Sequence, residues 1–263
     1  MIHFSSPAYT QNMKDSMFDA KDTATFHCRF ILRPEIIGYF ALAVLSAAIT
    51  ALIAESVGAA LWPMLAMVIL YPVAEHVLHR YLLHGNFLAK SAVTSPLWYR
   101  IHYRHHSKPS DQSVILAAPY TIVGAVAIFS VLFAVLFGSW TAFTGGLAVG
   151  SLLIIAYEYA HSVCHSAFPT NNRYLKAIRT NHILHHFHSE GGNYGITNNL
   201  SDVLFGTRYD EKSLPQRSPT VRNLGYDDEM RRAFPWIAQI EAGANEKLPE
   251  RGKLRRPEPQ KQQ

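Results

Sequence analysis

The chain has 263 residues, a formal net charge of +5 and 49% hydrophobic residues, and only 16% of its residues are charged. Because soluble domains typically carry about 25% charged residues, this composition with its long apolar runs indicates an integral membrane protein. The basic balance is typical of positive cytoplasmic loops. No nucleic-acid-binding motif accompanies it, so nucleic acid is not expected as a partner.

The predicted elements begin with a polar N-terminal arm, residues 1–34, which we expect in the cytosol. Pro34 is suited to open the first long helix, where its missing N–H is harmless. Within the second run, Pro63 and Pro72 are expected at a helix end and at a kink. Each of the four apolar runs approaches the roughly 20 residues that span a bilayer. They cover residues 36–54, 59–74, 114–137 and 140–157.

The connections within each pair of runs are only a few residues long, so we expect two helical hairpins. They contain Glu55 and no Lys or Arg, whereas the arm and the segment between the hairpins are rich in both. The positive-inside rule then places both termini and the central segment in the cytosol. Residues 35–207 form the expected membrane domain, and residues 208–263 a cytosolic segment, disordered from about 243. The alternative is a soluble protein with buried helices.

Histidines gather in four short boxes, all on the predicted cytosolic side of the spans. Each box has its own spacing: H-x4-H, H-x2-HH, H-x3-H and again H-x2-HH. In chain order they are His79 and His84; His102, His105 and His106; His161 and His165; and His182, His185 and His186. Because the topology was assigned from charge alone, this one-sided distribution is independent support for a single site.

The spacing has a physical reason. Positions i, i+3 and i+4 share one face of a helix, so the three histidines of each H-x2-HH box are expected to point one way. Five residues rotate by about 140°, so the first box is expected to bracket a helix end. Neutral imidazole suits Zn, Fe, Cu and Ni. Ten imidazoles exceed the needs of one ion, so we predict two ions with about five ligands each.

Other polar residues near the boxes are expected to support the ligands. Ligating histidines usually donate their second ring N–H to a carboxylate, a carbonyl or water. Glu158-x-x-His161 matches half of a soluble di-iron motif, but that site needs two such pairs, and the second is missing. We therefore expect no catalytic residue beyond the metal ligands, and no other cofactor site. The expected supporting residues are His76, Asp111, Glu158 and His188, with Glu75 as a further carboxylate.

The segments HRYLLH, HYRHHSKPSD, YEYAHSVCH and NHILHHFHSEGGNYGITNNLSDVLFGT, taken together, resemble the fatty acid hydroxylase superfamily over about residues 36–207. This superfamily also includes sterol desaturases and sterol methyl oxidases. The resemblance implies an all-α membrane protein whose ten boxed histidines bind two metal ions, iron in the working enzyme with zinc able to replace it. It also implies O2 as co-substrate and electrons from a separate carrier.

The box pattern, with Pro109 and Asp111, is most similar to the fatty acid 2-hydroxylase branch. Glu158 stands where that branch tends to have Asp, and Ser201 where many members have Trp. The resemblance thus implies hydroxylation of a lipid, with a fatty acyl chain as the expected substrate. A sterol or carotenoid oxygenase, a desaturase and a non-enzymatic metal-binding or metal-transport protein remain alternatives.

We expect no fused cytochrome b5 domain, because no haem-binding HPGG stretch is present and only 33 residues precede Pro34. The electron donor is therefore expected to be a separate cytochrome b5-like or ferredoxin-like protein.

The topology predicts which loops an impermeant reagent reaches. Cysteines introduced at Gly58 and Ser139 should react from the non-cytosolic side, because both lie in the predicted hairpin loops. A cysteine at Gln112 should react only after the membrane is opened. Labelling of all three positions from one side would contradict this topology.

Overall fold

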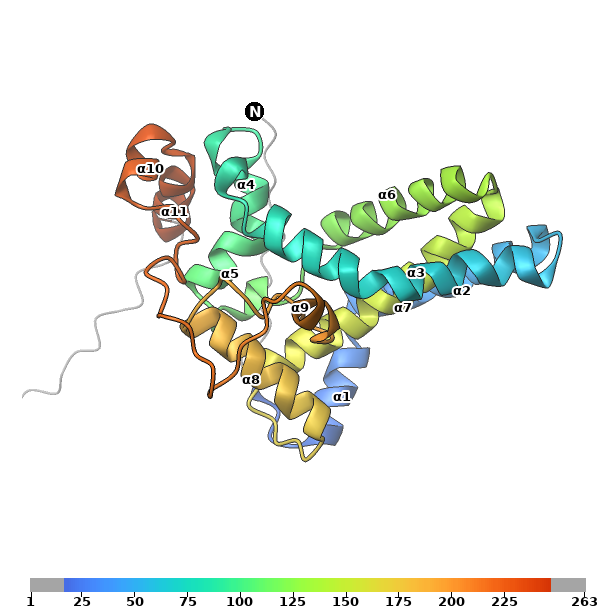
Figure 1. Cartoon of the computed structure of the whole chain (residues 1–263), viewed down its shortest axis with the longest axis horizontal. Helices are drawn as coiled ribbons and strands as arrows, with labels where there is room; N and C mark the ends of the chain where they lie inside the picture. Colours follow the sequence, from blue (N-terminus) through green and yellow to red (C-terminus); the bar gives the residue numbers. More distant parts are fainter. Residues whose placement is uncertain (1–16, 247–263) are drawn as a thin grey trace, which may run out of the picture.

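Four long helices form an apolar bundle: α2 (Pro34–Ile53), α3 (Val57–Val77), α6 (Pro119–Phe137) and α7 (Trp140–His165). The structure is a computed structural model that describes residues 17–246, and all regular structure in this range is helical. These four helices lie in the segments that are long and apolar enough to cross a membrane. Figure 1 shows them projecting together from a cluster of shorter helices. The all-α class with four membrane helices is confirmed.

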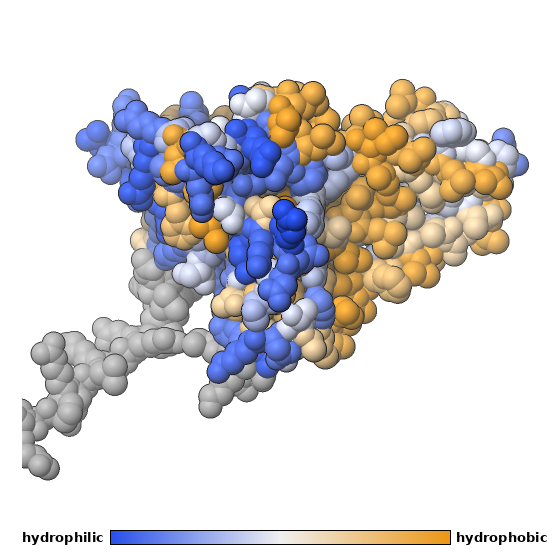
Figure 2. Space-filling model, turned by 60° about the horizontal axis from the view of Figure 1, so that its bottom comes forward, coloured by the Kyte–Doolittle hydropathy of each residue, from blue (hydrophilic) through white to orange (hydrophobic). Residues whose placement is uncertain are grey.

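The surface divides in the same way. Figure 2 shows hydrophobic side chains around the bundle and hydrophilic ones around the cluster of shorter helices. A bilayer would solvate the first region and water the second. The structure therefore has one membrane-facing part and one polar cap, consistent with an integral membrane protein.

Local signals explain where the long helices begin. Pro34 occupies the start of α2, as expected. Ser56 caps α3 by accepting a hydrogen bond from the backbone N–H of Ala59 (3.1 Å), a common N-cap arrangement. The third span starts at Pro119 rather than near residue 114, because a residue before proline is driven out of the helical region; Ala118 is extended, with ψ 126°.

Two further expectations need correction. Pro63 lies inside α3, as does Pro72, so Pro63 does not mark a helix end. The fourth helix does not stop near residue 157 but continues to His165. Its last two turns carry the third histidine box out of the apolar bundle and into the cap.

α7 is the central helix of the bundle and packs against α2, α3 and α6. Small residues allow this: a Cβ added to Gly150 would lie 2.6 Å from Cγ1 of Val126 on α6. Close backbone approach through small residues is a usual route to helix association in membranes. Thr50 of α2 also donates a hydrogen bond to the hydroxyl of Thr144 on α7 (2.8 Å).

The cap is built from short elements before, between and after the spans. Residues 208–246 pack onto it: Tyr226 and Ile237 join Trp98 and Tyr103 in one buried cluster. The last described helix, α11, reaches Glu246, so the segment expected to be disordered from about 243 begins inside a helix. The rest of that segment lies outside the described residues, as do residues 1–16 of the N-terminal arm. The short elements are η2 (Met17–Asp19), α1 (Thr23–Ile31), η3 (Leu78–Leu83), η4 (Asn86–Lys90), α4 (Ser95–Trp98), η5 (Tyr99–Tyr103), α5 (Arg104–Ser107), η6 (Gln112–Val114), α8 (Arg173–Phe187), α9 (Leu200–Leu204), α10 (Asp228–Ala233) and α11 (Trp236–Glu246).

Candidate metal centre

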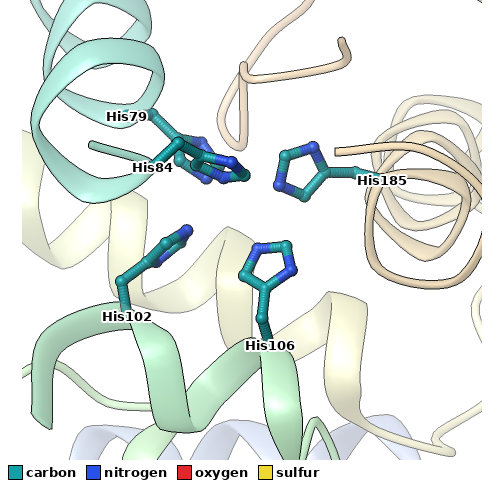
Figure 3. A group of neighbouring side chains, drawn as sticks. All are labelled: His79, His84, His102, His106 and His185. Carbon is teal, nitrogen blue, oxygen red and sulfur yellow. The ribbon is translucent and has the colours of Figure 1, made fainter. Parts of the chain in front are cut away.

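The fold brings the ten boxed histidines together in two groups of five. In each group every histidine offers one ring nitrogen, and these nitrogens all lie within 4.8 Å of one another. Figure 3 shows the rings of the first group converging on one point from three directions. The first group is His79, His84, His102, His106 and His185, and the second group is His105, His161, His165, His182 and His186.

The two histidines of the first box point toward the same place because the helix that carries them changes to a wider π-helical turn. α3 passes directly into the π-helical turn η3, and the backbone N–H of His84 donates to the carbonyl of His79 (3.1 Å). A π turn closes its hydrogen bonds between residues i and i+5, which places both members of the H-x4-H box on one face. The box does end at a helix end, as expected, but the two rings share one side of the turn (Figure 3).

The three histidines of each H-x2-HH box do not point in one direction, so the expectation that they would is wrong. In each box the i, i+4 pair enters one group and the middle histidine enters the other. His102 and His106 join the first group while His105 joins the second. Adjacent residues on a helix point about 100° apart, so a helix lying between two centres supplies both.

The fourth box repeats this division with the groups exchanged. His182 and His186 join the second group, and His185 joins the first. His161 and His165, one turn apart at the end of α7, both belong to the second group. Each group therefore takes histidines from three separate boxes, and the second and fourth boxes contribute to both groups.

The ring nitrogens of the first group fit a bound ion. The Nε2 atom of each of its five histidines is buried and has no hydrogen-bond partner among the described residues. A buried polar atom without a partner costs about 1–3 kcal/mol. Five such atoms would cost about 5–15 kcal/mol, which matches the whole stability of a typical domain. A cation at the point of convergence would remove this cost.

The second group fits an ion by its distances. Nε2 of His161 lies 2.9 Å from Nε2 of His105, and Nε2 of His182 lies 2.9 Å from that of His165 and 3.0 Å from that of His186. Two nitrogens each about 2.1 Å from one ion, at an angle near 90°, are about 3.0 Å apart. The donor set therefore suits a borderline transition metal in both groups.

Burial keeps these rings in the form that binds metal. Desolvation lowers the pKa of His185 to about 4. The same cause, followed by neighbouring imidazoles, lowers the pKa of His182 and His186 well below the usual value. Only a neutral imidazole has a free lone pair to donate to a metal, so the rings are ready to bind an ion at neutral pH.

Backbone carbonyls orient three rings of the first group. Nδ1 of His79 lies 2.5 Å from the carbonyl oxygen of Tyr194, Nδ1 of His185 lies 2.7 Å from that of Gly192, and Nδ1 of His106 lies 3.0 Å from that of Val221. With Nδ1–H donating to the carbonyl, Nε2 carries the lone pair that faces the centre. Sequence reasoning missed these three partners, because a backbone carbonyl leaves no residue-type signal.

Two buried carboxylates hold the loop that carries two of these carbonyls. Asp202 accepts hydrogen bonds from the backbone N–H groups of Tyr194 (2.9 Å) and Gly195 (2.7 Å). Glu75 accepts from the backbone N–H groups of Ile196 (3.0 Å) and Thr197 (2.9 Å). Among the described residues Glu75 has no hydrogen bond to a grouped ring, so it acts on the rings through this loop.

The four residues expected to support the ligands lie outside both groups. Nδ1 of His76 is 3.4 Å from the Asp202 carboxylate, so this histidine belongs to the carboxylate network behind the loop. Asp111 binds Arg104, and Glu158 accepts from the backbone N–H of Ala117 (3.0 Å). His188 follows the last residue of α8, and its ring reaches the Pro215 carbonyl (2.7 Å). A direct bond from Asp111, Glu158 or His188 to a grouped histidine is not among the hydrogen bonds of the described residues.

The loop contacts generate a prediction. Replacing Asp202 by Asn keeps the shape but gives up one of the two acceptor oxygens that hold Tyr194 and Gly195. Since outer-shell partners typically contribute 10–100-fold to metal affinity, we expect metal affinity to fall by about that factor. The measurement is metal content per chain after dialysis against a graded chelator series. Asp210→Asn, at an exposed turn, is the matched control; equal metal retention by the two variants would contradict the assignment.

Comparison with known proteins places this site in a family. The family model for fatty acid hydroxylases matches residues 64–207, which contain every boxed histidine. Fatty acid 2-hydroxylase of Rattus norvegicus is 30% identical over 149 residues, covering 56% of this chain and 40% of that protein. Dihydroceramide fatty acyl 2-hydroxylase FAH1 of Arabidopsis thaliana is 32% identical over 135 residues, covering 51% and 54% of the two chains.

A solved structure shares the fold. Full-length scs7p, in which only the hydroxylase domain is visible, superposes with a TM-score of 0.61 at 20% identity and covers 77% of this chain and 71% of that one. The match to the rat relative spans about two fifths of that protein's length. Since the family model covers more than half of the chain and contains both histidine groups, the chain belongs to the fatty acid hydroxylase family.

Proposed function

We propose that this protein is a membrane-bound oxidoreductase that hydroxylates a lipid, with a fatty acyl chain as the substrate, using O2 and electrons from a separate carrier. The observation that carries the proposal is the pair of five-histidine groups at one end of an apolar four-helix bundle. The names of the rat and Arabidopsis relatives, both 2-hydroxylases of fatty acids or fatty acyl groups, support the acyl substrate.

The ten histidines would hold two metal ions, with iron expected and zinc able to occupy the same nitrogens. When bound, the metal pair supplies the capacity to activate O2 and oxidise a strong C–H bond, which side chains alone lack. The chain's own contribution is to hold the imidazoles neutral and oriented. The carbonyls of Gly192, Tyr194 and Val221 orient three of them.

The position of the site supports a substrate that arrives from the bilayer. His79 follows α3, and His161 and His165 lie in the last turns of α7, so both groups adjoin the ends of membrane helices. An acyl chain lying along these helices would reach the histidines without crossing water. Burial of the rings would also exclude water from the reacting carbon.

We further propose that both termini and the histidine groups face the cytosol, because the basic residues lie on that side of the spans. A cytosolic site would be open to a soluble or membrane-anchored electron carrier of the cytochrome b5 or ferredoxin type. Sterol or carotenoid oxygenation, desaturation, and metal binding without catalysis remain distinguishable outcomes of the test below.

The test is expression with a suitable reductase system under oxygen-18 gas, followed by mass spectrometry of total lipids. We expect acyl species heavier by one labelled oxygen atom, absent from the His185→Ala variant and retained in His27→Ala, whose ring binds the Tyr159 hydroxyl away from the site.

Label found only in sterols or carotenoids would identify one of these, and not an acyl chain, as the substrate. Lipids that lose two hydrogens without gaining label would identify the protein as a desaturase. A metal-loaded, reduced protein that oxidises no lipid would contradict the enzymatic assignment.

A further inference from the structure

α9 presents an apolar face that nothing in the described part of the chain covers. Leu200, Val203 and Leu204 are 66%, 58% and 68% exposed. Asp202 is the one charged residue between 198 and 207, and it is fully buried on the opposite face. An uncharged outward face of this kind is typical of an interaction surface.

The depth of α9 follows from its contacts with α3. Ser201 donates a hydrogen bond to the carbonyl of Pro72, and the ring of Phe205 lies 4.8 Å from that of His76. Phe205, the C-cap of α9, comes four positions after Ser201, and His76 comes four positions after Pro72 on α3. α9 therefore runs alongside α3 in the same direction for about one turn. Pro72 precedes His79 by seven residues, which places it about 10 Å further into the bundle.

The apolar face of α9 is therefore at the level of the membrane span. Val68, Ile69 and Leu70 of α3, two to four residues deeper than Pro72, are exposed and apolar. Two cations follow the end of this contact that is nearer the histidine groups. They are Arg80, four residues after His76, and Arg208, three residues after Phe205. Basic side chains bordering an apolar band are typical of the headgroup region.

We propose that α9 is inserted in the lipid bilayer, with Leu200, Val203 and Leu204 among the acyl chains and Arg208 at the headgroups. An open hollow of about 320 Å³ lies at the end of α9, with apolar Val203 and cationic Arg208 in its wall beside the acidic Asp202 and Asp210. In Figure 1, α9 lies where the bundle meets the cap.

Insertion of α9 has a consequence for the site. α9 directly follows the loop whose Gly192 and Tyr194 carbonyls orient His185 and His79. A lipid-embedded α9 fixes this loop at the bilayer surface and brings acyl chains beside the first histidine group. The inference rests on membrane insertion of the four spans and is independent of the reaction catalysed.

The test is depth measurement by electron paramagnetic resonance on the full chain in phosphatidylcholine nanodiscs. Cys28, which is exposed, is replaced by Ser, and buried Cys164 is kept. Spin labels are attached in single variants Leu200→Cys and Leu204→Cys. Ile69→Cys on α3 is the lipid reference, and Lys212→Cys in an exposed loop is the aqueous reference.

We expect both α9 labels to collide more with O2 than with a water-soluble nickel complex, as at Ile69, with position 200 deeper than position 204. Preferential collision with nickel, as at Lys212, would place α9 in water and overturn the proposal. Low collision with both reagents would show that protein, such as a second copy of the chain, covers the face, and would overturn it equally. Lipid hydroxylation is not part of the readout, so the two proposals fail separately.

Discussion

The structure depends on one constraint: ten imidazoles, eight of them buried and two partly buried, must remain neutral while one ring nitrogen of each converges on one of two points. Desolvation keeps the rings neutral, lowering the pKa of His185 to about 4. Convergence is harder, because a regular α-helix cannot place residues five apart on one face. The π turn η3 resolves this for His79 and His84. The unpartnered Nε2 atoms of the first group make this arrangement costly unless a cation is bound.

The same constraint explains why the cap surrounds the site. Carbonyls from the loop after α8 and from the C-terminal segment fix the rings, and Val221, which orients His106, lies beyond the region that the family model matches. Glu75 and Asp202 hold the loop from behind, so one carboxylate at the end of α3 and one in α9 act on the centre through backbone atoms. These two carboxylates thus help to orient the grouped rings without a direct hydrogen bond to one of them among the described residues.

Much of this could be predicted from the sequence, for identifiable reasons. Uncharged runs of spanning length reveal the four helices. The boxes reveal the ten histidines, and their number alone predicts the division into five and five. The sequence could not predict that His105 and His185 each join the other group from the two remaining histidines of their own box. This division depends on each helix lying between the two groups. The π turn and the carbonyl partners of His79, His106 and His185 leave no residue-type signal either. Spacing predicts which residues share a helix face, but not which centre each face meets.

The division of the boxes is most directly tested by anomalous X-ray scattering from crystals of the metal-loaded protein, compared with its His185→Ala variant. The account predicts two ions per chain, one bound by the first group and one by the second, with His182 and His185 on different ions. In the variant, occupancy should fall at the first site and persist at the second. A single ion, or one ion bound by both His182 and His185, would contradict it.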